Sequence, residues 1–417
     1  MKRVAAVMMA ASLCACADVP ETSEVAPEAA TLSLNNVHDC SELDAFDPGD
    51  DADLVLRLEI AQMLCQLPAP DLDPAAVAAA LGERNFAVLT GPSTLTLVAR
   101  SDAESVGAWP DVRANLERIG DSDLWAAQFR ASEIDSAILM FIPPGLTGPS
   151  FSNDDLVFWR GSAAPDAPTL KPDIAGQVID REVWSDALQE TRRVEVYLPE
   201  GHHEGGAYPA VFLADGAVVA YYARIVEPMI DAGLIPPIVL VGALSGAGGI
   251  VEDRSGSDVD WRNADYLQGF YAEEDRFSQH MDFFANELTR YAEQEFSVSI
   301  DRRDRIVQGH SSGGAFALSA GLLHPEVFAT AWPSSPGWRP LREIGPADEA
   351  SASFSFSAGY YEASFQYSSR VSARTLAEHG YQVRETYRPG GHGSGLPTAM
   401  LVQDLTELFA DRGRAPE

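Results

Sequence analysis

The residues with the clearest chemical potential form the segment Gly309-His310-Ser311-Ser312-Gly313. It follows a β-branched run and precedes an Ala- and Leu-rich segment with helical spacing, so the sequence predicts a strand, a sharp turn and a helix. Glycines suit the close approach of strand and helix, and a serine in such strained backbone projects its hydroxyl above the sheet. Ser311 is therefore the candidate nucleophile, and an ordinary Gly/Ser-rich turn is the alternative.

Backbone N–H groups near this serine could stabilise a developing oxyanion. Ser312 begins the predicted helix, where N–H groups can face an anion. A second donor is expected in the turn Asp215-Gly216, after the strand predicted at 210–213. For Asp215 itself, an ordinary strand-ending turn is an equal alternative.

A serine hydroxyl needs a base to take its proton, and that base needs an orienting partner. His324 and His379 end predicted helices, whereas His392 lies in a glycine-rich loop before the last predicted helix. Serine, acid and histidine follow in this order along the chain of a strand–turn–helix hydrolase. His392 is therefore the candidate base.

The acid is expected just after the strand predicted at 353–357, where Glu362 follows a glycine turn. Asp348 and Glu349 precede that strand and Asp404 lies in the last predicted helix, so we interpret each as a solvated carboxylate. A Ser–His pair without an acid, in which Glu362 would be structural, is the alternative.

Apolar strands alternate with helices in the second part of the chain. This pattern predicts an α/β domain over residues 175–417, with a mostly parallel sheet covered on both faces. The expected strands are 193–198, 210–213, 238–243, 328–332, 353–357 and 382–387, and the expected helices are 219–232, 277–296, 367–379 and 398–410.

The preceding part, residues 51–165, reads as a helical segment followed by a small β-sandwich. Its helices are expected at 51–66 and 74–81, and its strands at 86–89, 95–99, 124–129, 137–142 and 156–159. A Pro- and Ala-rich linker at 161–173 separates it from the α/β domain.

The chain opens with a basic tripeptide and an apolar run that is too short to cross a bilayer as a helix. The run ends Leu13-Cys14-Ala15-Cys16, which resembles the lipobox of bacterial lipoproteins. We therefore expect a signal peptide at 1–15, lipidation of Cys16 and a disordered tether at 16–50. This predicts an exported, outer-membrane-anchored lipoprotein in the periplasm or on the cell surface. An ordinary cleaved signal that releases a soluble protein is the alternative.

Cysteine use agrees with export. Cys40 and Cys65 remain after processing and lipidation, and they could form one disulfide in an oxidising compartment. Such a bond would join the end of the tether to the first helix.

Charge limits the possible partners. The chain has 29 basic and 62 acidic residues, a net charge of −33, so nucleic acid and anionic lipid surfaces are poor partners. His202, His203 and Glu204 lack further nearby metal ligands, and we expect neither a metal nor a cofactor.

We call the turn at Ser311, between the predicted strand and helix, the elbow. Several segments beyond the elbow and the loop Gly390-Gly391-His392 resemble the enterochelin esterase (Fes-like) branch of the esterase D group of α/β-hydrolases. The resemblance spans residues 86–409 and implies an α/β-hydrolase fold preceded by a sandwich that covers the active site. The similar segments are Tyr208-Pro209 to Asp215-Gly216, Arg262 to Tyr266 with Asp265 in place of a glutamate, Phe284 to Leu288, Ser334 to Trp338, and, in the sandwich, 95–99 and 121–125.

The resemblance implies a small-molecule ester as substrate, cleaved through an acyl-enzyme, with a siderophore-type or related ester favoured. Candidate substrate contacts are Trp338 for an aromatic acyl group and three arginines for an anion, with core packing and surface salt bridges as alternatives: Arg262, Arg339 and Arg342. The family's siderophore enzymes commonly follow the histidine with Asp-Trp, whereas Gly393-Ser394-Gly395 follows here. An exported esterase acting on acylated sugars, feruloyl or acetyl groups is the second hypothesis, and a non-catalytic ligand-binding lipoprotein is the third.

Overall fold

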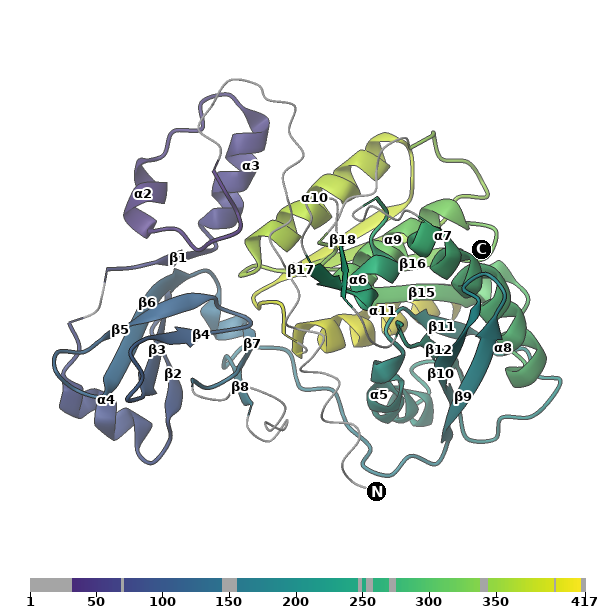
Figure 1. Cartoon of the computed structure of the whole chain (residues 1–417), viewed down its shortest axis with the longest axis horizontal. Helices are drawn as coiled ribbons and strands as arrows, with labels where there is room; N and C mark the ends of the chain where they lie inside the picture. Colours follow the sequence, from purple (N-terminus) through teal and green to yellow (C-terminus); the bar gives the residue numbers. More distant parts are fainter. Residues whose placement is uncertain are drawn as a thin grey trace.

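The computed structural model describes residues 32–68, 71–144, 156–246, 250–252, 258–269, 275–337, 344–393 and 395–413. Figure 1 shows two lobes side by side, with the early part of the chain in purple and blue and the later part in teal to yellow. We call residues 32–160 the N-terminal lobe and residues 174–413 the C-terminal lobe. No described helix is long and apolar enough to span a membrane.

A single six-stranded antiparallel sheet dominates the N-terminal lobe. Its strand order is β2-β3-β6-β5-β4, with β1 paired to β6. A separate ribbon is formed by β7 and β8. The strands are β1 (Leu64–Gln66), β2 (Phe86–Thr90), β3 (Thr94–Arg100), β4 (Val106–Ala108), β5 (Ala114–Arg118), β6 (Leu124–Ala131), β7 (Ile138–Phe141) and β8 (Val157–Arg160).

The two faces of this sheet bury alternate residues of the same strands, as the two-residue period of a strand requires. Leu97 and Phe129 face the β7–β8 ribbon, whereas Val98 and Ala126 face helix α4 (Pro74–Leu81). The expected sandwich is thus one full sheet covered by a short ribbon on one side and a helix on the other. Helix α4 has the predicted bounds, because Asp73 caps its first turn and Gly82 ends it.

The N-terminal helical segment corrects two expectations. The tether expected at 16–50 ends before residue 32, since Leu32 and Leu34 are buried and α2 (Cys40–Ala45) is helical. The helix expected at 51–66 is shorter, α3 (Ala52–Ala61), because the chain turns there and continues as β1. Cys40 and Cys65 are joined by a disulfide with a Cα–Cα distance of 5.0 Å.

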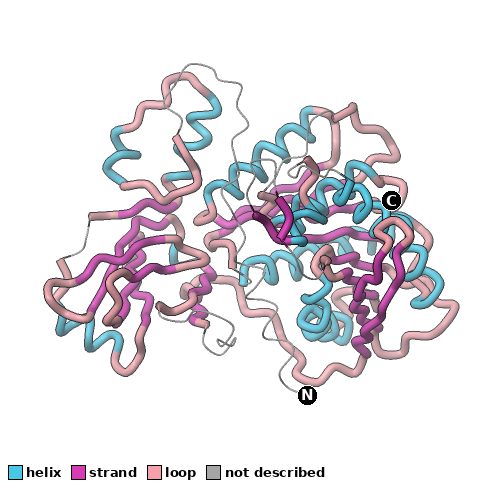
Figure 2. The backbone as a smooth tube through the Cα atoms, viewed as in Figure 1, coloured by secondary structure: helices cyan, strands magenta, loops and turns pink. Residues whose placement is uncertain are grey.

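The C-terminal lobe is built on an eight-stranded sheet in the order β18-β17-β16-β15-β11-β12-β10-β9, drawn in magenta in Figure 2. All pairings from β12 to β18 are parallel, whereas β10 pairs antiparallel with β12 and with β9. The strands are β9 (Gln177–Ser185), β10 (Glu190–Leu198), β11 (Ala210–Leu213), β12 (Val239–Ala243), β15 (Arg305–His310), β16 (Thr330–Ser334), β17 (Ser353–Gly359) and β18 (Val383–Arg388), with a separate hairpin of β13 (Ile250–Glu252) and β14 (Asp258–Asp260).

Helices cover both faces of this sheet. One face packs against α7, the following π-helical segment, α8, α9 and α10, and the other packs against α5 and α11. The helices are α5 (Val219–Asp231), α6 (Trp261–Tyr266), α7 (Asp275–Asp282), the π-helical segment η4 (Phe283–Leu288), α8 (Thr289–Phe296), α9 (Ser312–Leu323), α10 (Ala363–Glu378) and α11 (Gly395–Gly413). This covering explains why the central strands read as continuous apolar runs.

The predicted sheet included β10, as 193–198, but omitted the edge strand β9. β9 lies at the edge with several exposed side chains, so it lacks the apolar run by which the inner strands were recognised. The helix expected at 277–296 is present without a break, but its middle part, η4, has π-helical geometry between α7 and α8.

Candidate active site

Ser311 lies at the turn between β15 and α9, where the sequence places it. Its backbone has φ 61° and ψ −124°, a region that side-chain-bearing residues rarely adopt. A Cβ on Gly309 would lie 2.0 Å from the carbonyl oxygen of Gly313, so only glycine fits there. The Ser311 N–H donates to the carbonyl of Ser334 on β16 at 3.0 Å. The strained turn is therefore held between neighbouring parallel strands at their carboxyl ends.

His392 and Glu362 form a buried pair. The Nδ1–H of His392 donates to Oε2 of Glu362 at 2.5 Å. The other carboxylate oxygen, Oε1, accepts from the Ser335 hydroxyl at 2.6 Å and from the Gly359 N–H at 2.5 Å. Because the carboxylate is held by these donors, it fixes the tautomer and direction of the imidazole and leaves Nε2 as the acceptor.

Two aromatic rings fix the plane of His392. Phe365, in the first turn of α10, stacks on the imidazole with ring centroids 4.0 Å apart, and His310 lies at 4.5 Å. The Nε2–H of His310 donates to the carbonyl oxygen of His392 at 3.1 Å. Since His310 directly precedes Ser311, this contact brings the His392 loop to the elbow.

The pKa shifts at this site favour an ionised Glu362 and a neutral His310. Burial alone would raise the pKa of Glu362, but the charge and hydrogen bond of His392, with the Ser335 hydroxyl, hold it below its usual value. Burial, followed by the charge of His392, lowers the pKa of His310 to about 3. His310 is therefore neutral, and its Nδ1 accepts from the Ser334 hydroxyl at 3.2 Å.

The expected oxyanion region lies directly beside the elbow. Ser312 is the first residue of α9, and Asp215-Gly216 follows β11, the strand paired with β15. The Asp215 carboxylate is clamped by Arg262 at 2.6 and 2.8 Å, and the same guanidinium donates to the carbonyl of His310 at 3.1 Å. Only the backbone of Asp215 is thus suited to face an oxyanion, while its side chain anchors the loop.

Arg262 was expected to contact substrate, and its geometry points instead to a supporting role. Its side chain is largely buried and its charge is balanced by Asp215. Asp265, three residues further, is fully buried and pairs with Arg192 and Arg276. The segment that resembles the family's Arg-x-x-Glu motif therefore makes three ion pairs, which tie α6 to the sheet and to α7.

The other titratable residues considered as acid or base lie elsewhere. His324 pairs with Glu326, and the Nδ1–H of His379 donates to the carbonyl of Thr375 at 2.8 Å. Asp404, interpreted as solvated, is in fact buried beside Ser355 and Arg384 because α11 packs on the sheet. Burial raises its pKa to about 6.

Some predicted residues fall outside the described part of the chain. These are Cys16, and the substrate candidates Trp338, Arg339 and Arg342. Within the described residues, no group of three or more His, Cys, Asp or Glu side chains could hold a metal ion.

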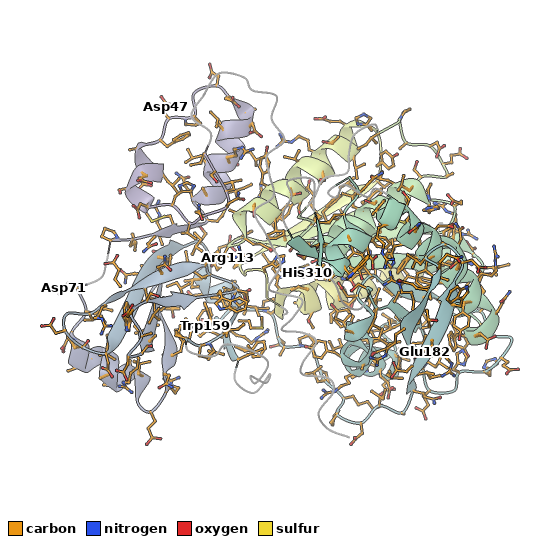
Figure 3. All side chains as sticks on the ribbon, in the orientation of Figure 1. Asp47, Asp71, Arg113, Trp159, Glu182 and His310 are labelled. Atoms are coloured by element: carbon orange, nitrogen blue, oxygen red, sulfur yellow. A yellow bond between two sulfur atoms is a disulfide. The ribbon has the colours of Figure 1, made fainter. Side chains whose placement is uncertain are left out.

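Sequence reasoning expected an N-terminal sandwich that covers the active site, but it identified none of the residues by which this lobe lines the site. A cavity of about 70 Å³ lies between the lobes, and its walls include Asp111 and Arg113 from one side and Glu362, Phe365 and His392 from the other. In Figure 3 the labelled Arg113 and His310 lie on facing sides of the boundary between the lobes. The only available signal was the resemblance to esterases with a covering sandwich, which names no residue on this wall.

Comparison with known proteins identifies a matching family model and solved structures with a similar fold. Residues 185–408, more than half of the chain, match the family model Esterase, described as "Putative esterase". The enterobactin esterase FES of Shigella flexneri, crystallised in the presence of enterobactin, has a similar fold with a TM-score of 0.57 at 16% identity. The match covers 79% of this chain and 96% of that one.

Two further solved structures show the same similarity of fold. The enterochelin esterase of Shigella flexneri matches with a TM-score of 0.57 at 16% identity, covering 80% of this chain and 97% of that one. The ferric enterobactin esterase of Salmonella typhimurium matches with a TM-score of 0.54 at 15% identity, covering 79% and 97%. This coverage exceeds the C-terminal lobe, so it includes much of the N-terminal lobe as well.

Proposed function

The chain belongs to the esterase family and is an ester-hydrolysing enzyme, and on this premise we propose that it uses Ser311 as a nucleophile and forms an acyl-enzyme. The observation that carries the proposal is the Glu362–His392 pair, which the His310 contacts bring to the elbow serine. A binding protein without turnover would not require a strained serine, an oriented imidazole and a buried carboxylate in one place.

In the proposed reaction, Oγ of Ser311 attacks the ester carbonyl carbon while Nε2 of His392 takes the hydroxyl proton. The N–H of Ser312 and a backbone N–H near Asp215-Gly216 stabilise the oxyanion. His392 returns the proton to the departing alcohol, and Glu362 stabilises the imidazolium that forms between these steps. Water, deprotonated by His392, then releases the acid and restores Ser311.

The direct test is hydrolysis of a short-chain p-nitrophenyl ester by the purified chain. Ser311→Ala should lower kcat by about 10³- to 10⁶-fold, because the nucleophile is lost while the binding groups remain. Ser319→Ala is the matched control, since Ser319 is a buried serine of α9 whose hydroxyl donates to the carbonyl of Ala315. If the wild type is inactive and a fluorophosphonate does not label Ser311, the serine mechanism is wrong.

For the substrate, we propose an anionic aromatic ester of the siderophore type. The similarity of both lobes to enterobactin esterases supports this class. A net charge of −33 repels such a ligand, so a local cation is needed. Arg113 provides one, because it lines the cavity beside His392, is exposed and makes no ion pair within the described residues.

This substrate class can be tested against its main competitor. Arg113→Gln should lower kcat/KM for an anionic catecholate ester by about tenfold, a loss that added salt should shrink, and leave a neutral feruloyl or acetyl ester unchanged. Arg181→Gln, a charge removal on the exposed strand β9, is the control. Equal effects on both esters would favour an exported esterase acting on acylated sugars, feruloyl or acetyl groups.

We also propose export and anchoring through a lipid at Cys16. The disulfide between Cys40 and Cys65 supports an oxidising compartment. Labelling with radioactive palmitate in a bacterial host should occur in the wild type and be lost in Cys16→Ser. Equal labelling of both chains, or of neither, would contradict the anchor.

A further inference from the structure

Asp111 is a buried carboxylate of the N-terminal lobe that contacts the loop carrying His392. It lies 282 positions before Gly393, whose N–H donates to its Oδ1. Its other oxygen, Oδ2, accepts from the N–H of Met140 on β7 at 2.6 Å. The side chain is 3% exposed. One carboxylate therefore joins the backbone of its own lobe to the loop of the other.

The glycines beside His392 are packed against this residue. A Cβ on Gly391 would lie 2.4 Å from the carbonyl oxygen of Asp111, and a Cβ on Gly393 would lie 2.6 Å from its Oδ1. A short parallel bridge between Ile138 and Gly390 continues the contact. The loop is glycine-rich because backbone and carboxylate of the N-terminal lobe approach it from outside.

We propose that Asp111 is a positioning residue for the esterase reaction: it holds the backbone at Gly391 and Gly393 and thereby sets the direction of the His392 imidazole toward Ser311. The inference rests on the serine mechanism proposed above. A loop of glycines has a large conformational freedom to lose, so an external contact is needed to fix it. A misplacement of about 1 Å at a reacting group can lower a rate about 100-fold.

The contact requires two acceptor oxygens, one for each N–H donor. Two N–H donors point at the side chain, and a carboxylate accepts from both, whereas an amide presents one oxygen and one NH₂ group. In Asp111→Asn one N–H donor would face another donor. Burial raises the pKa of Asp111 to about 7, with the charge of Glu362 acting in the same direction and the two N–H donors and His392 opposing it. Above pH 7 the ionised form predominates although its burial is unfavourable.

The test compares Asp111→Asn with wild type in the full chain, using the p-nitrophenyl ester at pH 8. We expect kcat to fall by about 10- to 100-fold with KM changed less than threefold, because substrate contacts are kept while the base is misdirected. The rate at which a fluorophosphonate labels Ser311 should fall by a similar factor. Asp404→Asn, which removes another buried carboxylate, should leave both rates unchanged even if its melting temperature falls.

A second variant addresses the same contact from the other side. Gly393→Ala brings a Cβ against Oδ1 of Asp111 and should slow labelling of Ser311 to a similar extent. If the contact is the cause, the double variant should be no slower than the slower single variant. This variant is also measurable if Asp111→Asn does not fold.

The outcomes separate the two proposals. An inactive wild type with unlabelled Ser311 overturns the serine mechanism and this inference with it. An active wild type with full kcat and labelling in Asp111→Asn, or with additive losses in the double variant, overturns the role of Asp111 alone.

Discussion

The two halves of the candidate site are placed by different means. Ser311 depends on a contiguous stretch in which β15, the turn and α9 follow one another, and on parallel pairing with β16. His392 lies in a loop whose position depends on contacts with the other lobe, through Asp111 and Ile138. The nucleophile is thus set by local chain geometry, whereas the base is set by contacts between distant parts of the chain.

This difference predicts how the site should respond to changes in each lobe. Changes within the C-terminal lobe should act on the chemistry directly, whereas changes in the N-terminal lobe should act through the His392 loop or through stability. Glu362 connects the two lobes, because it orients His392 and precedes α10. Helix α10 packs against the cluster that holds α3 and the disulfide between α2 and β1.

After loss of the nucleophile, the largest effect is expected at Glu362. Glu362→Gln should lower kcat by about 10³- to 10⁴-fold, because an amide cannot both accept from Nδ1–H of His392 and stabilise the imidazolium. Steady-state kinetics on the p-nitrophenyl ester measure this, with Asp348→Asn as an exposed control before β17. A loss below tenfold would indicate a Ser–His pair in which Glu362 is structural.

A smaller effect on stability is expected from the disulfide. Replacing both Cys40 and Cys65 by Ala should lower the free energy of unfolding by about 3 kcal/mol, as the bond closes a loop of 25 residues. Denaturant unfolding measures the loss, and kcat at 25 °C should stay within about threefold of wild type. A kcat loss as large as that of Asp111→Asn would show that the helical segment also positions the site through α10.

The smallest effect is a pH dependence of stability that distinguishes the two buried carboxylates of the cavity. The pKa of Asp111 is raised from 3.8 to about 7, so its protonated form stabilises the fold and this contribution is lost as pH rises through that range. Glu362 has a lowered pKa, so its contribution is lost only as pH falls below its usual value of 4.5. The charge of His392, which lines the same cavity, lowers the pKa of both carboxylates.

Between pH 5 and pH 7 the wild type should therefore lose about 1–2 kcal/mol of stability relative to Asp111→Asn. Thermal or urea unfolding of the two proteins side by side measures the difference, in which other titrating groups largely cancel. A difference that stays constant over this range would mean that Asp111 is already ionised at pH 5 in the folded protein.

Sequence alone predicted much of the C-terminal lobe. The strand–turn–helix at Ser311 follows from glycines and apolar runs that act over about ten residues, and inner strands and helices follow from their periodicity. Glu362 and His392 were chosen because they follow Ser311 in the expected order, one after a predicted strand and one before the last predicted helix. The structure places Nδ1 of His392 2.5 Å from Oε2 of Glu362.

Tertiary structure decided the groups that hold these residues in place. His310 contacts the candidate base, Ser335 contacts the candidate acid, and Asp111 contacts the loop that carries the base. Each is a common residue type whose local sequence carries no signal of a distant partner. The pairing of Arg262 with Asp215, and the burial of Asp404, likewise depend on side chains far apart in the chain. The physical reason is range: backbone preference and apolar period act between near neighbours, whereas hydrogen bonds of buried charges are fixed only when the two lobes and the sheet have come together.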